Sequence, residues 1–419
     1  MKRIFISLFF FAFMWTAAGA DASPELLFVR WPANPDAVWY SFRIVPVTQH
    51  FGRKEMRPPI YEDGHVFRDS VMIEKEITDS YDGPGILCCQ VKAIGLDGQS
   101  ISAYSAPVPI EKVAQEMERY APKIRVKYHE QNGTVLLYPA YSFVKIPHAV
   151  SYEVEITDEE PENPDGCEPS VHRISQGIVT IPELFDELPR QGTVWWRVRG
   201  LDENGGPVGV WSEAEKIVND PAENWETGIL GDSISHGGGR MSYSPADWSY
   251  NYAYYLDFPT INMSRSGDKT EDLLRRFDAD VLPFHVRYLL IMVGTNNLRC
   301  GGTEEVISDL EALQEKCRAN DIEPVLLTIP PIAPDRIWKY YQQPTAENWK
   351  AEFDKVNGWI RMQTHIDTAA PFAMYEDMPE NFAADGLHPD KEAKEKMGKI
   401  INEKFPEIRK KISETKIQK

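Results

Sequence analysis

Cysteine is scarce in this sequence, and its spacing forms no recognisable framework. Five cysteines occur among 419 residues, with no Cys-x-x-Cys pair and no cysteine–histidine spacing typical of zinc sites. This excludes a disulfide-rich scaffold and predicts a protein without a metal or other cofactor. Cys88 and Cys89 would point to opposite faces of a strand. A Cys300–Cys317 disulfide is an alternative, but we expect free buried thiols.

Positive charge is also under-represented. Lysine and arginine total 45 against 64 aspartate and glutamate residues, which gives a formal net charge of -19 at pH 7. An acidic surface argues against nucleic acid or an anionic membrane as a partner. The chain is long enough for two or three domains.

Long apolar runs are absent beyond residue 20. Lys2 and Arg3 precede an almost continuous apolar run over residues 4–15, and residues 18–20 (Ala-Gly-Ala) form a typical cleavage site. Residues 1–20 are therefore a predicted secretory signal peptide, which is too short for a membrane span. We expect a secreted or periplasmic protein with no membrane span.

Two all-β modules are predicted next, at residues 21–112 and 113–220. Short alternating runs and turn residues suit β-sandwiches. Three sequence pairs recur at a spacing of about 107 residues, which indicates a duplicated module. The pairs are Trp31-Pro32-Ala33 with Tyr138-Pro139-Ala140, Val91-Lys92-Ala93-Ile94 with Val198-Arg199-Gly200-Leu201, and Tyr104-Ser105 with Trp211-Ser212. The modules resemble fibronectin type III-like domains, and are either spacers or a binding surface for carbohydrate or another partner.

Residues 221–419 change to alternating strand and helix patterns, which predict a parallel α/β sheet. The expected strands are 227–230, 259–262, 288–293 and 324–329. The expected helices are 245–255, 269–282, 303–319, 346–363 and 390–405. Loops at the carboxyl ends of such strands converge on one site.

Those loops carry the residue types that acyl transfer needs. Ser233, in a Gly-Asp-Ser turn, is the candidate nucleophile, and His388 is the base that a neutral hydroxyl requires. Asp385, three residues before His388, can orient the imidazole. The backbone N–H groups of Ser233 and Gly267 and the side-chain amide of Asn296 are candidate donors to the oxyanion.

These residues resemble the SGNH (GDSL-type) hydrolases. Four blocks stand in family order: Gly231-Asp232-Ser233, Asn262 to Gly267, Gly294-Thr295-Asn296 and Asp385-x-x-His388. The resemblance implies a three-layer flavodoxin-like fold and a Ser-His-Asp site without metal. It also implies that Ser233 is the nucleophile, that Asp385 and His388 complete the triad, and that Gly267 and Asn296 serve the oxyanion hole. The first block lacks the leucine of the nominal motif, and Asn297 stands where many relatives have aspartate.

Three further residues are weaker candidates for substrate contacts. His236 follows the nucleophile by three residues and can line a substrate pocket. Arg240 and Trp248 lie further along the same segment, and each also fits an ordinary surface or packing role.

The expected function is that of a secreted serine esterase acting on carboxylic esters, with O-acetyl groups on carbohydrates as the leading substrate class. Predicted export and abundant tryptophan and tyrosine favour an acetylated glycan as the partner. A lipolytic esterase or thioesterase acting on acyl chains is one alternative. The other is a non-catalytic glycan-binding protein that retains a hydrolase fold.

Overall fold

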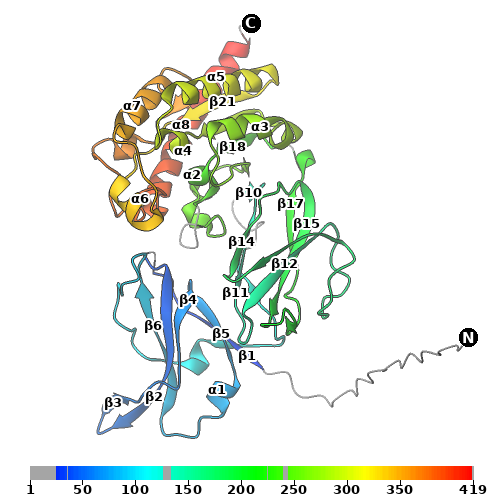
Figure 1. Cartoon of the computed structure of the whole chain (residues 1–419), viewed down its shortest axis with the longest axis vertical. Coiled ribbons are helices and arrows are strands. Elements are labelled where there is room, and N and C mark those ends of the chain that lie inside the picture. The colour runs from blue at the N-terminus through cyan, green and yellow to red at the C-terminus, as the bar shows by residue number, and fades with distance from the viewer. Residues whose placement is uncertain (1–24, 35, 126–133, 224, 239–243, 418–419) are drawn as a thin grey trace, which may run out of the picture.

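A computed structural model describes residues 25–34, 36–125, 134–223, 225–238 and 244–417. Two β modules precede a C-terminal α/β domain (Figure 1). The predicted all-β N-terminal region is therefore confirmed. The predicted signal peptide and Arg240 lie outside the described residues. Within the described ranges, no helix combines the length and apolar character that crossing a membrane requires.

The first β module packs two sheets against each other. One has the strand order β5-β1-β8, and the other has the order β3-β2-β6-β7, with β4 also paired to β2. Its elements are β1 (Leu26–Arg30), β2 (Trp39–His50), β3 (Arg53–Met56), β4 (Tyr61–Phe67), β5 (Ser70–Glu74), α1 (Glu76–Asp79), β6 (Ile86–Ile94), β7 (Val108–Pro109), η1 (Ile110–Lys112) and β8 (Ala114–Met117). Because β8 pairs with β1, this module extends past the predicted boundary at residue 112.

The second β module also contains two sheets. Their orders are β14-β11-β9 and β13-β12-β15-β16, with β17 also paired to β15. The strands are β9 (Lys123–Ile124), β11 (Ala140–Val144), β12 (Ser151–Thr157), β13 (Arg173–Val179), β14 (Glu183–Phe185), β15 (Gly192–Leu201), β16 (Pro207–Val208) and β17 (Glu215–Asn219).

Equivalent hairpins form the centre of both modules, in keeping with the recurring sequence pairs. The antiparallel pair β2–β6 corresponds to β12–β15. In each first strand, a tyrosine hydroxyl accepts a hydrogen bond from a backbone N–H six residues earlier. Tyr40 bonds Asn34 at 2.5 Å, and Tyr152 bonds Ile146 at 3.1 Å. The shared contact supports duplication of one structural unit.

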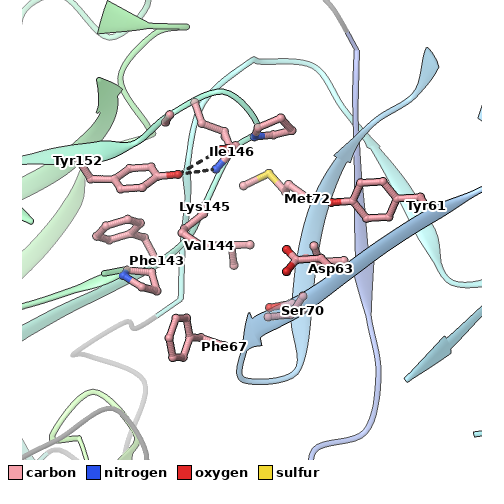
Figure 2. Close-up of a pocket in the computed structure, with 15 residues that line it drawn as sticks. Tyr61, Asp63, Phe67, Ser70, Met72, Phe143, Val144, Lys145, Ile146 and Tyr152 are labelled. Atoms are coloured by element: carbon pink, nitrogen blue, oxygen red, sulfur yellow. Dashed lines mark hydrogen bonds between the residues drawn. The ribbon is translucent and has the colours of Figure 1, made fainter. Parts of the chain in front are cut away.

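The two modules share a packed interface. Leu26 and Met72 of the first module belong to the hydrophobic cluster of the second. Beside them lies a cleft of about 130 Å³, which is lined by Tyr61 and Met72 of the first module and by Phe143 and Ile146 of the second (Figure 2). The modules therefore pack directly against each other through apolar side chains.

The C-terminal domain is built on five parallel strands in the order β19-β18-β20-β21-β22. Numbered along the domain, this is the flavodoxin-like order 2-1-3-4-5. The strands are β18 (Thr227–Gly231), β19 (Ile261–Asn262), β20 (Tyr288–Met292), β21 (Glu323–Leu327) and β22 (His365–Ile366). All but β22 correspond to strands expected from the sequence.

Helices cover both faces of this sheet. Leu289 and Ile291 of β20 pack into the cluster beneath α3, α5 and α7, whereas Leu290 and Met292 pack into the cluster beneath α8. The helices and 3-10 turns are η2 (Pro221–Glu223), α2 (Ser233–His236), η3 (Trp248–Tyr250), η4 (Tyr252–Tyr255), α3 (Thr270–Asp280), η5 (Leu282–Phe284), α4 (Thr295–Leu298), α5 (Thr303–Ala319), α6 (Pro334–Tyr341), α7 (Trp349–Ile360), η6 (Ala370–Phe372) and α8 (Lys391–Ile417).

Two expected helices differ in the structure. The helix expected at 245–255 is replaced by the turns η3 and η4, because Asp247 and Asn251 side chains accept the backbone N–H groups of Ser249 and Ala253. The helix expected to end at residue 405 continues through Pro406 to Ile417, because later apolar residues still pack against the domain core.

One strand crosses the predicted boundary between modules. The short strand β10 (Val135–Leu136) comes from the second β module but pairs in parallel with β19 of the C-terminal sheet. Its flanking bonds are Val135 N–H to Thr260 O at 3.2 Å and Leu137 N–H to Asn262 O at 2.8 Å. The second module therefore completes the edge of the C-terminal sheet.

Arg68 joins all three domains. Its guanidinium, on the first module, lies 3.3 Å from the Glu183 carboxylate of the second module and 3.2 Å from the Asp247 carboxylate of the C-terminal domain. The Glu183 side chain is 0% exposed. Burial raises the pKa of Glu183, while Arg68 and Ser244 favour its charged form.

Replacing Arg68 by methionine is expected to destabilise the protein by about 3 kcal/mol, because Glu183 would keep a buried charge without its cation. Chemical denaturation followed by tryptophan fluorescence measures this loss. Arg30→Met is the control, since the Arg30 side chain is 69% exposed in its pair with Asp69 and should contribute less than about 1 kcal/mol. Equal effects of the two substitutions would contradict the prediction.

The five cysteines are all free thiols. Cys88, Cys89 and Cys317 are buried, as expected, whereas Cys300 is exposed. The alternative Cys300–Cys317 disulfide is not formed in the structure.

Candidate active site

Three loops of the C-terminal domain meet at one edge of its sheet. They follow β18, β19 and β20, which lie side by side in parallel. Ser233 follows β18, Gly267 follows β19 and Asn296 follows β20. Strands β18 and β20 flank the point where the strand order reverses, which is where open α/β sheets bind ligands. The topology therefore gathers residues that are far apart in the sequence.

The turn before Ser233 is shaped by its two preceding residues. A Cβ at Gly231 would come within 2.2 Å of the Met292 carbonyl oxygen, so only glycine fits there. Asp232 caps α2, and its carboxylate accepts the Ile234 N–H at 2.9 Å. Ser233 is thereby fixed as the first residue of the helix.

The predicted triad residues form a continuous chain of hydrogen bonds. His388 Nε2 lies 3.0 Å from Ser233 Oγ, and His388 Nδ1 lies 2.7 Å from Asp385 Oδ2. The other carboxylate oxygen of Asp385 accepts the N–H groups of Leu387 and His388, each at 2.8 Å. Because the carboxylate accepts from Nδ1–H, Nε2 is left to accept the serine proton.

Asp385 is held in its charged form. The residue is 0% exposed, and burial by itself raises the pKa of the carboxyl. The His388 imidazole and hydrogen bonds from His388 and Tyr341 outweigh that effect and lower the pKa below its usual value. Asp385 is therefore suited to orient His388 and to stabilise it as an imidazolium.

Tyr341 is a site residue that the sequence analysis missed. It ends α6, and its hydroxyl donates to Asp385 Oδ2 at 2.5 Å while lying 3.3 Å from His388 Nδ1. Pro334 followed by an apolar–aromatic pattern signalled a helix here. The pattern did not show that this helix would end against the triad.

Replacing Tyr341 by phenylalanine is expected to lower kcat about tenfold with little change in KM, because one hydrogen bond that orients the Asp385 carboxylate is lost. Steady-state hydrolysis of 4-nitrophenyl acetate measures both constants. Tyr340→Phe on the same helix is the control and should keep the wild-type kcat. A rise in KM at unchanged kcat would assign Tyr341 to substrate binding instead.

The candidate oxyanion donors lie on two neighbouring loops. Gly267 is exposed at a φ of +91°, and a Cβ placed on it would meet no atom within 4 Å, so space is open beside this residue. Asn296 donates one side-chain N–H to the Asp268 carbonyl at 2.9 Å. Its amide carries a second N–H, so this bond orients the side chain without using all its donors.

The two weaker substrate-contact candidates that the structure describes, His236 and Trp248, are both buried. His236 is 2% exposed, and its two nitrogens bond to the Tyr138 carbonyl and to Ser266. Trp248 is buried in the hydrophobic cluster of the second β module. Both side chains are therefore buried at contacts with the second module, and His236 also lines a cleft that includes Phe185 and Gly267.

Lys394 is a second residue that the sequence analysis missed. It is buried beneath α2, where its ammonium group donates to the Ile234 carbonyl. Burial lowers the pKa of Lys394 to about 7, and burial raises the pKa of neighbouring Asp232 to about 6. Lys394 therefore supports the short helix α2 that begins with the nucleophile, through its bond to the Ile234 carbonyl.

The arrangement suits nucleophilic acyl transfer, with a serine, a base, an orienting carboxylate and candidate amide donors. In the part of the chain that the structure describes, no group of three or more His, Cys, Asp or Glu residues is placed to hold a metal ion.

Residues 229–396 match the model of the GDSL-like lipase/acylhydrolase family. This segment holds Ser233, Gly267, Asn296, Asp385 and His388, and the match supports a GDSL-like hydrolase domain at the C-terminal end of the chain. No curated protein matches the chain.

Several solved structures resemble the C-terminal part. A lipase/acylhydrolase from Enterococcus faecalis is 24% identical, covers 43% of this chain and 94% of its own, and has a TM-score of 0.35. A GDSL-like lipase from Bacteroides thetaiotaomicron is 17% identical, with 45% and 90% covered and a TM-score of 0.36. The acetylxylan esterase Axe2 from Geobacillus stearothermophilus is 19% identical, with 42% and 92% covered and a TM-score of 0.33.

Proposed function

We propose that this protein is a serine esterase that hydrolyses carboxylic esters through an acyl-enzyme on Ser233. The observation that carries the proposal is the hydrogen-bond chain from Ser233 Oγ through His388 to Asp385. A neutral serine hydroxyl is a weak nucleophile, and a base within hydrogen-bond distance activates it.

The reaction that we propose uses each of these groups in turn. Ser233 Oγ attacks the ester carbonyl carbon while His388 Nε2 takes the hydroxyl proton. The N–H groups of Ser233, Gly267 and Asn296 stabilise the oxyanion of the tetrahedral intermediate. Its collapse breaks the ester bond, and His388 returns the proton to the leaving alcohol. Water, activated by His388, then attacks the acyl-enzyme, which releases the acid and restores Ser233.

For the substrate, we propose O-acetyl groups on carbohydrates. Support comes from the predicted signal peptide, the accompanying β modules and the abundance of tryptophan and tyrosine, which can stack on sugars. We also propose that the mature protein is exported, on the evidence of the charged and apolar pattern in residues 1–20.

Acetate release from a panel of acetylated polysaccharides and sialoglycans tests this proposal, with 4-nitrophenyl acetate and octanoate measured beside it. We expect release of acetate from at least one glycan, and faster hydrolysis of 4-nitrophenyl acetate than of the octanoate. A preference for octanoate would favour a lipolytic esterase or thioesterase. Binding of a glycan without hydrolysis of any ester would favour a non-catalytic glycan-binding protein.

A further inference from the structure

A polar cleft separates the second β module from the candidate oxyanion loop. Its volume is about 360 Å³. One wall is residues 185–187, from the end of β14, and the other is residues 265–268 with His236 and Asp272. A cleft of this size falls in the range of small-molecule sites. The cleft lies between two domains, so it cannot be predicted from the catalytic motifs alone or from the sequence of the β modules alone.

The cleft opens beside the reaction centre. Gly267 belongs to its lining, and Gly267 is also the exposed glycine whose amide is a candidate oxyanion donor. An ester carbonyl held at that amide would therefore place one of its two substituents at the mouth of the cleft. The cleft and the candidate oxyanion hole therefore share Gly267.

The two walls are held in fixed positions. His236 Nε2 lies 2.7 Å from the carbonyl oxygen of Tyr138, which can only accept, so Nε2 carries the proton. His236 Nδ1 then accepts the Ser266 N–H at 3.2 Å, one residue before Gly267. Burial lowers the pKa of His236 to about 4, so the imidazole stays neutral. The second module is thus connected to the oxyanion loop through one buried ring.

The side chains that line the two walls indicate which kind of ligand the cleft can bind. Phe185 is half-buried and presents its ring edge-on to His236, with centroids 6.5 Å apart. Asp186 and Asp272 are paired with Arg190 and Arg275, whereas Glu187 is exposed and has no ion pair within the described residues.

A ring for stacking beside an unpaired carboxylate suits a hydroxyl-bearing sugar. The Glu187 carboxylate repels an anionic sugar, because Arg265 on the opposite wall is already paired with Asp268.

We propose that the second β module forms part of the substrate site, with Phe185 and Glu187 binding the neutral, polyhydroxylated alcohol portion of the ester. This inference rests on the proposed esterase function and names the alcohol class that the site selects. The second module is thereby a determinant of specificity and not a spacer.

Three esters test the inference: cellobiose monoacetate, digalacturonate monoacetate and 4-nitrophenyl acetate. The wild type should prefer the neutral disaccharide ester over the anionic one. Phe185→Ala and Glu187→Gln should each raise KM for cellobiose monoacetate about tenfold and leave 4-nitrophenyl acetate within about twofold. Glu187 is exposed, so its variant should fold even if Phe185→Ala does not. Leu188→Ala, beside the cleft but outside its lining, is the matched control.

Charge reversal gives a second readout. Glu187→Lys should shift the ratio of kcat/KM for the two disaccharide esters about tenfold toward digalacturonate monoacetate. A wild-type preference for the anionic ester, or equal effects of the variants on all three esters, would overturn the inference. Hydrolysis of 4-nitrophenyl acetate alone would overturn it while leaving the esterase function intact. If the protein hydrolyses none of the three esters, both this inference and the proposed esterase function are wrong.

Discussion

The Ser233→Ala variant is expected to lose at least about 10,000-fold in kcat/KM for 4-nitrophenyl acetate, because no oxygen remains to form the acyl-enzyme. The removed hydroxyl accounts for one hydrogen bond to His388 in the folded state. Thermal unfolding should therefore stay close to that of the wild type. A fluorophosphonate probe, followed by intact-protein mass, should label the wild type and leave the variant unlabelled.

Ser235→Ala is the matched control for this experiment. Ser235 lies on the same short helix, but its hydroxyl accepts from the Tyr252 hydroxyl at 3.0 Å on the core side. We expect this variant to keep kcat/KM within a few-fold and to retain labelling. Undiminished hydrolysis by Ser233→Ala would show that the nucleophile has been wrongly assigned.

The second large effect is expected at Asn296. Its replacement by alanine should lower kcat about 100- to 1,000-fold with a small change in KM, because an oxyanion donor acts mainly in the transition state. The substitution also removes the bond from Asn296 to the Asp268 carbonyl, which lies on the loop that carries Gly267. Pre-steady-state hydrolysis of 4-nitrophenyl acetate isolates the acylation step.

Asn297→Ala distinguishes this role from simple support of the loop. The Asn297 side chain accepts the Thr270 N–H at 3.2 Å and donates to Glu271 at 3.0 Å, at the beginning of α3. The expected result is a lower unfolding temperature with kcat within a few-fold of the wild type. If Asn297→Ala lowers kcat as much as Asn296→Ala, the amide of Asn296 is not the donor.

The parallel sheet was readable from the sequence because its strands are buried on both faces and read as continuous apolar runs. The expected helix at 303–319 has the same bounds as α5, where Thr303 and the acidic first turn mark the beginning. The 245–255 segment was misread because side chains of Asp247 and Asn251 compete with helical backbone bonds. The spacing of apolar residues alone carries no information about that competition.

Most of the candidate site could be predicted because each of its residues directly follows a strand or precedes a helix within a short motif. Tyr341 reaches Asp385 only through the packing of α6, because the two residues are 44 positions apart in the chain. The cleft beside Gly267 depends on β14 of another domain. Such contacts depend on the tertiary fold, and local patterns in the sequence do not contain them.

The pairing of β10 with β19 limits how this chain can be divided. A fragment beginning at residue 221 would keep every catalytic candidate, yet β19 would become an exposed edge strand with unpaired backbone groups. Such edges favour pairing between copies and aggregation. The C-terminal domain therefore cannot be transferred to another protein by itself. Recombination or engineering that exchanges this domain must include the second β module.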